Sequence, residues 1–148
     1  MSAATVSDLY TRDFYAWTQE SARLLQEKRF SELDVQHLIE EIQSMGASER
    51  RELLNRLEVL LIHLLKWHYQ PVWRGQGWQL TLKEQRRKLA RLLLENPSLK
   101  ALLQQAILDA YGDAVLSAAK ETGLAESTFP TQCPYTEAQI FDMGYYPD

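Results

Sequence analysis

Cysteine is nearly absent from this 148-residue chain, and long hydrophobic runs are absent altogether. The only cysteine, Cys133, has no second thiol with which to form a disulfide, which favours a reducing cytoplasm. A membrane-spanning helix needs about 20 apolar residues, but the most apolar stretch, 57–67, is interrupted by Glu58, His63 and Lys66. The sequence starts with polar residues instead of a basic, apolar leader. We therefore expect a cytoplasmic protein with no membrane partner.

The short motifs of common catalytic sites are also missing. The chain has no Gly-x-Ser-x-Gly elbow, no glycine-rich phosphate loop and no zinc-protease His-Glu pair. Zinc-finger and helix-turn-helix spacings are absent too. Cys133 stands between Gln132 and Pro134, with no neighbouring base to activate its thiol. We expect no catalytic residues and no cofactor, and we favour a non-enzymatic role.

Apolar residues recur at helical spacing along most of the chain. Apolar residues make up 45% of the sequence and charged residues 24%, as in ordinary globular domains. The pattern predicts a single all-α domain over 1–148, an up-down bundle of about five helices. We expect these helices at about 9–28, 35–45, 49–69, 78–95 and 97–121.

The helix at about 49–69 is predicted to be the central one, because leucines occupy most of its circumference. Gly46 is predicted to end the helix before it. Residues 123–148 contain three prolines and several aromatics, so we expect an irregular strap with one short helix capped by Thr136. The inward stripe of the second helix is predicted to consist of Val35, Leu38, Ile39, Ile42 and Met45.

Charge is unevenly distributed along the chain. Residues 1–49 have four basic and nine acidic side chains, residues 50–100 have eleven and four, and residues 101–148 have one and seven. A basic middle between acidic ends permits neutralisation within one domain, and it also permits a surface for an anionic partner. The overall charge of −4 favours neutralisation within the domain.

A metal site is one alternative, because helix bundles build such sites from Glu and His on facing helices. His37 and Glu41 stand one turn apart, and His63 lies on the next predicted helix. The competing interpretation is that Glu41 pairs with an arginine and His63 bonds to a neighbouring polar group.

A nucleic-acid surface is a second alternative, since cations and tryptophans together contact phosphates and stack on bases. The ordinary interpretation of such residues is a solvated helix face, with Trp78 in the core. The candidate residues are Arg74, Lys83, Arg86, Arg87, Lys88, Arg91 and Lys100, with Trp73 and Trp78.

The favoured interpretation is a protein-binding or regulatory module whose partner is another protein or a second copy of the chain. It rests on elimination and on the end of the central helix with the 71–78 loop, which joins aromatic and charged residues. The candidate surface comprises His63, Lys66, Trp67, Tyr69, Gln70, Trp73 and Arg74.

Four segments in order resemble the bacterial, largely cyanobacterial, family called domain of unknown function 29. They are DFYAWTQESARLL, LIEEIQSMGASERRELLNRLEVLLIHLLKWHYQP, LTLKEQRRKLARLLLENPSL and ETGLAESTFPTQCPYTEAQI, which together cover nearly the whole chain. The resemblance implies an all-helical domain, and it implies no established activity or catalytic residue. Glu40, Glu41, His63, Lys66, Trp67, Tyr69 and Pro71 stand at the positions of the family's motif residues.

Overall fold

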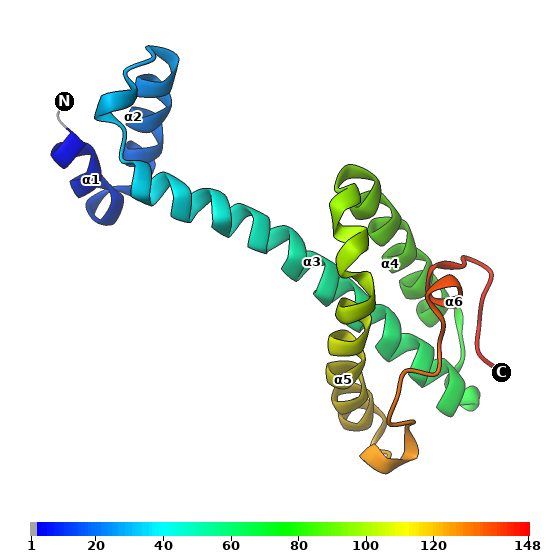
Figure 1. The fold of residues 1–148 in the computed structure, drawn as a ribbon. Coiled ribbons are helices and arrows are strands. Elements are labelled where there is room, and N and C mark those ends of the chain that lie inside the picture. The colour runs from blue at the N-terminus through cyan, green and yellow to red at the C-terminus, as the bar shows by residue number, and fades with distance from the viewer. Residues whose placement is uncertain (1–2) are drawn as a thin grey trace. The chain divides into compact units, whose positions relative to one another are not determined.

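A computed structural model describes residues 3–148, with side chains from residue 6 onward. Within this range the chain forms six α-helices and four short 3-10 helices, and it contains no strand (Figure 1). The predicted all-α class is therefore confirmed. The chain forms two compact units, Met1–Ser48 and Glu49–Asp148. The expectation of one domain over 1–148 stays a prediction.

The first unit begins with two helices where the sequence predicted one over 9–28. Helix α1 (Ala3–Arg12) ends before Asp13, and α2 (Phe14–Gln26) begins after it. Asp13 is responsible for the break, because its Oδ1 accepts a hydrogen bond from the Ala16 amide at 3.1 Å and so caps α2.

A small apolar core holds the first unit together. Val6 of α1 and both Trp17 and Leu24 of α2 are buried. After α2 the chain turns at Lys28, which has a φ of 58°, and passes through the 3-10 helix η1 (Phe30–Glu32). The partly buried residues that pack on this core are Leu9, Tyr10, Leu33 and Leu38.

Helix α3 (Val35–Tyr69) is a single run of 35 residues (Figure 1). The prediction that Gly46 ends a helix is wrong, and so is the predicted start of a new helix at about 49. A glycine inside a helix costs only about 1 kcal/mol relative to alanine, and good helix formers follow it. The helical assignment therefore continues past Ser48, the last residue of the first unit.

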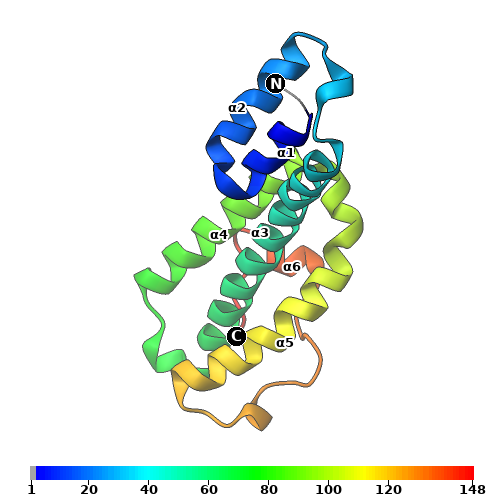
Figure 2. The ribbon, with the colours of Figure 1, turned by 90° about the vertical axis from the view of Figure 1, so that its left-hand side faces the viewer.

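The second unit is built around the C-terminal part of α3. Helix α4 (Gln76–Glu95) and helix α5 (Leu103–Thr122) share one leucine-rich core with it (Figure 2). The connections are the 3-10 helices η2 (Pro71–Trp73) and η3 (Pro97–Leu102). The small residues of α5 are buried as the sequence predicted: Ala106, Ala110, Ala114 and Ala118.

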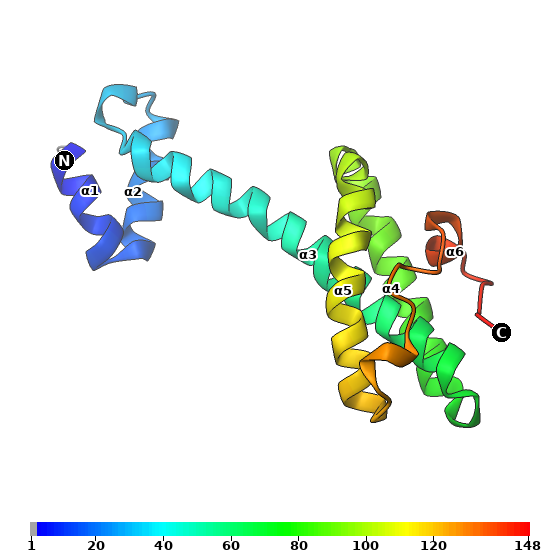
Figure 3. The same ribbon diagram turned by 60° about the horizontal axis from the view of Figure 1, so that its bottom comes forward.

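The strap, residues 123–148, follows α5 and packs on the same core (Figure 3). It starts at Gly123, whose φ of 77° ends α5, and contains η4 (Glu126–Thr128) and α6 (Glu137–Phe141). The predicted cap of the short helix is confirmed: Thr136 and Gln139 form a reciprocal capping box. Phe129, Tyr135 and Ile140 are buried. Nowhere in the described part of the chain is a helix long and apolar enough to cross a membrane.

Candidate interaction surfaces

The predicted surface at the end of α3 is largely covered by the strap. Trp67 is buried, and its ring lies 4.9 Å from that of Tyr146. Tyr69 packs edge-on against Phe129, with ring centroids 5.2 Å apart. These two aromatics therefore hold the strap instead of facing solvent.

Arg74 is occupied as well. Its Nε donates a hydrogen bond to the Trp67 carbonyl at 2.7 Å, and its Nη2 donates to the Asp148 carbonyl at 2.9 Å. The guanidinium also lies over the Trp67 ring, 5.3 Å from its centroid. Gln70 follows α3, and its carbonyl accepts a hydrogen bond from the Trp73 amide at 3.0 Å. Only Trp73 remains strongly exposed, at 69%.

Lys66 and His63 make contacts within the second unit. The Lys66 ammonium lies 3.6 Å from a Glu121 oxygen and 5.2 Å from the centre of the Trp78 ring. His63 Nδ1 is 2.8 Å from the Val59 carbonyl oxygen, the one-turn contact of a histidine with its own helix. Burial, joined by the nearby Lys66 charge, lowers the pKa of His63 below its ordinary value.

Arg86 does not belong to the predicted nucleic-acid surface, because its side chain is buried and only 1% exposed. Its Nε donates to the Ile140 carbonyl at 2.8 Å and its Nη2 to the Gln139 carbonyl at 3.2 Å. Burial lowers its pKa. The spacing that reveals this position is present in the sequence, since Leu82, Arg86, Leu89 and Leu93 follow one helix face.

The remaining cations of α4 form a basic face, defined by Lys83, Arg87 and Arg91. All three are exposed, and none is ion-paired to an acid within residues 3–148. Lys88 differs because its Nζ lies 2.6 Å from Glu84. Leu80, which is 55% exposed, lines an open hollow of about 520 Å³ together with Glu84 and the four cations Lys83, Arg87, Lys88 and Arg91.

The first unit contains a polar network centred on the buried Asp34. Its Oδ2 accepts a hydrogen bond from Trp17 Nε1 at 3.0 Å and lies 2.6 Å from His37 Nδ1. Burial raises the pKa of Asp34, but the hydrogen bonds from His37 and Trp17 outweigh burial, and the pKa lies below its ordinary 3.8. Tyr10 stacks on the His37 ring and donates to Glu41, whose acceptance of this hydrogen bond raises the pKa of Tyr10 to about 12.

This network leaves the predicted metal site without support. Glu41 bonds to Tyr10 and not to an arginine, and His37 is held by Asp34. His63 belongs to the second unit. Across residues 3–148, no group of three or more His, Cys, Asp or Glu side chains is placed to hold a metal ion.

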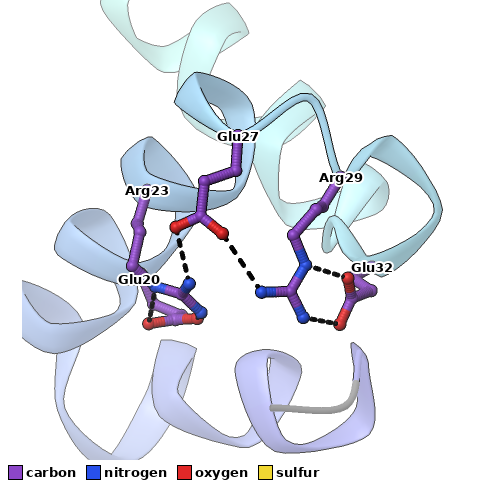
Figure 4. Close-up of polar contacts among 5 residues, drawn as sticks. All are labelled: Glu20, Arg23, Glu27, Arg29 and Glu32. Carbon is purple, nitrogen blue, oxygen red and sulfur yellow. Dashed lines mark hydrogen bonds and ion pairs between the residues drawn. The ribbon is translucent and has the colours of Figure 1, made fainter.

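Two arginines of the first unit are engaged in a surface chain of ion pairs (Figure 4). Arg23 pairs with Glu20 and with Glu27, and Arg29 connects Glu27 to Glu32. Within residues 3–148, Glu40, Glu41 and Glu49 form no ion pair.

A hollow of about 660 Å³ in the second unit lies between α5 and the strap. Tyr111, Val115, Phe129 and Pro130 supply its apolar wall, and Glu126 is the one carboxylate in its lining. The Tyr111 hydroxyl is already committed, because it donates to the Pro130 carbonyl at 2.6 Å. The lining also includes Ser127 and Thr131, which have hydroxyl groups.

The main feature that the sequence did not predict is the exposure of the N-terminal part of α3. Val35, Ile39, Ile42 and Met45 were expected to face inward, but they are 55%, 44%, 65% and 68% exposed. Only Leu38 of the predicted stripe packs on the core of the first unit. The four exposed residues are called the α3 stripe below.

The α3 stripe continues a face of the helix that is buried further along. Eighteen residues make about five helical turns, so positions 18 apart point in the same direction. Leu53, Leu57 and Leu60 stand 18 residues after Val35, Ile39 and Ile42, and all three are 0% exposed. One apolar face is thus covered along its second part and uncovered along its first.

A comparison with protein families completes the description. The family model called domain of unknown function DUF29 matches residues 9–146. The chain belongs to this family. No curated protein and no solved structure matches the chain.

In this DUF29 chain the residues that carry the family resemblance do two different things. Lys66, Trp67 and Tyr69 bind Glu121 or strap aromatics, and Pro71 opens η2 where α3 has ended. Glu41 holds Tyr10 in the first unit. These contacts are internal, so they explain how the DUF29 fold is held together and do not define a free site.

Proposed function

We propose that this DUF29 domain is a non-catalytic protein-binding module of the bacterial cytoplasm, and that the α3 stripe is its contact surface. The observation that carries the proposal is the exposure of Val35, Ile39, Ile42 and Met45 on a helix face that is otherwise buried. Contiguous apolar side chains on a soluble protein are characteristic of contact sites.

The arrangement favours a helical partner. The α3 stripe has the 3.6-residue periodicity with which one helix packs against another, and its continuation already binds α4 and α5 in the same way. Covering it removes apolar surface from water at about 25 cal/mol per Å². This free energy is available to any partner that presents a complementary apolar ridge.

The surroundings of the single cysteine support a non-catalytic role. Burial raises the pKa of the Cys133 thiol, and Sγ lies 3.5 Å from the Tyr135 carbonyl oxygen. A raised pKa disfavours the reactive thiolate.

Nucleic-acid binding is the second candidate, and the basic face of α4 favours it. It has fewer free cations than the sequence indicated, because Arg74 holds the strap, Arg86 is buried and Lys88 is paired with Glu84. A nucleic-acid complex through Lys83, Arg87 and Arg91 would weaken steeply with salt.

Photo-crosslinking in the native host tests the proposal. A photo-reactive phenylalanine analogue replaces Ile42 in one variant and Ser44 in a matched control. Both positions are exposed, and they point about 200° apart around the helix. We expect a discrete protein adduct from position 42 and none from position 44. Equal labelling at both positions, or adducts only with nucleic acid, would contradict the proposal.

A further inference from the structure

We propose that the α3 stripe binds a second copy of this chain, and that the second copy contributes the basic face of its α4. This inference rests on the proposed function and names the partner. It is drawn from the charges that flank the stripe and from those of the basic face.

The two surfaces carry matching charges at matching spacing. On α3, Glu41 and Glu49 are eight residues apart, with Met45 midway between them. On α4, Lys83 and Arg91 are eight residues apart, with Arg87 midway. Eight residues advance about 12 Å along a helix, so both acids can meet both cations in one contact.

Both rows follow the i, i+4 ridge of their helix. Packing two such ridges side by side is the commonest mode of helix contact in globular proteins. The charges match whichever way the second helix runs, because each row is symmetric about its midpoint. In either direction Met45 lies beside Arg87. The aliphatic stem of a long charged side chain can cover apolar surface, so Arg87 can cover Met45.

The apolar parts of the two surfaces also correspond. Leu80, at one end of the basic face, is 55% exposed, and Leu94, beyond the other end, is 80% exposed. The open hollow of about 520 Å³ between Leu80 and the basic residues can receive Ile42. A second copy therefore covers apolar side chains on both helices while it pairs their charges.

The charges that a second copy would neutralise lack ion pairs within the described part of one chain. Lys83, Arg87 and Arg91 form none, and neither do Glu41 and Glu49. Each copy carries both surfaces, so the contact is heterologous: it either closes into a ring, of which a reciprocal dimer is the smallest, or extends into a chain.

The full chain is tested by sedimentation analysis from 1 to 200 µM, at 50 and at 500 mM salt. We expect a species of at least two chains, with self-association weakened about tenfold or more at high salt. Glu49→Lys alone and Arg91→Glu alone should each weaken it about tenfold, whereas an equimolar mixture of the two variants should associate again. Lys100→Glu, an equal charge change at an exposed site on η3, is the matched control. Circular dichroism verifies that each variant is folded.

Three results would overturn self-pairing. They are a monomer at every concentration, self-association that Arg91→Glu leaves unchanged, and a mixture of the two variants that fails to associate. Crosslinking at Ile42 separates this failure from failure of the proposed function. If the chain is monomeric and position 42 captures a different protein, only the identity of the partner is wrong. If position 42 captures no protein, both proposals are wrong. If, in addition, the chain retains nucleic acid in a salt-sensitive way and Arg91→Glu abolishes this retention, the basic face is a nucleic-acid-binding surface.

Discussion

Arg86 donates a hydrogen bond from Nε to the carbonyl oxygen of Ile140 at 2.8 Å, joining α4 to a residue 54 positions later in the chain. Arg74 makes the same kind of bond to Asp148. Two arginines that look like surface cations in the sequence therefore fasten the strap, and both do so through main-chain oxygens.

Replacing Arg86 with alanine should lower the free energy of unfolding by about 3 kcal/mol. The change removes two charge-assisted hydrogen bonds, strands the Ile140 and Gln139 carbonyls and leaves a cavity. Urea denaturation measures the loss, and proteolysis within the strap should become faster. Arg87→Ala, an exposed neighbour, should change stability by no more than about 0.5 kcal/mol. Equal effects of the two substitutions would mean that Arg86 does not hold the strap.

Replacing Gly46 with alanine should stabilise the protein by about 0.5–1 kcal/mol. Gly46 lies inside α3, and a Cβ there meets no atom within 4 Å. Gly123→Ala is the opposing control: its φ of 77° is left-handed, and alanine should destabilise by about 1 kcal/mol. Thermal unfolding of both variants decides the question. A destabilising Gly46→Ala would indicate that α3 ends at this glycine in solution.

Asp34→Asn should flatten the loss of stability in acid. The pKa of Asp34 is lower in the folded chain than its ordinary 3.8, so its contribution is present above that pH and is lost as the pH falls through the folded value. Because other carboxylates titrate in the same range, the relevant quantity is the difference between wild type and variant in urea denaturation from pH 6 to 3. If the difference in stability between wild type and variant stayed constant from pH 6 to 3, Asp34 would not contribute to the loss of stability in acid.

His63→Gln should reduce the loss of stability between pH 7.5 and 5.5. The pKa of His63 is lower in the folded chain than its ordinary 6.5, so protonation favours unfolding as the pH falls through 6.5. Denaturation at the two pH values, for wild type and variant, measures the effect. If wild type lost less stability than His63→Gln between pH 7.5 and 5.5, the predicted direction of the effect would be wrong.

The helical class could be predicted from the sequence because it depends on periodicity, which is local. Helix ends were harder, since they depend on competing capping groups. Asp13 can continue a helix or cap a new one, and only its hydrogen bond to Ala16 decides. Gly46 presents the same ambiguity, and the helix propagates through it.

The candidate surfaces could be predicted less well, because periodicity marks an apolar face without identifying what covers it. Val35 and Leu53 share one face of α3, yet only Leu53 is buried. Conversely, counting charges placed Arg86 on the surface although its spacing from Leu82 and Leu89 places it on the core face of α4.

Because the two arginines hold the strap through main-chain oxygens, this attachment constrains the length of the strap and not its composition. Every residue has a main-chain oxygen, so the acceptors that the two guanidinium groups use do not themselves depend on which side chains the strap carries. An insertion or deletion between Ile140 and Pro147 is different, because it moves one attachment point out of register with the other. Relatives that use the same two arginines should therefore preserve the number of residues in this segment.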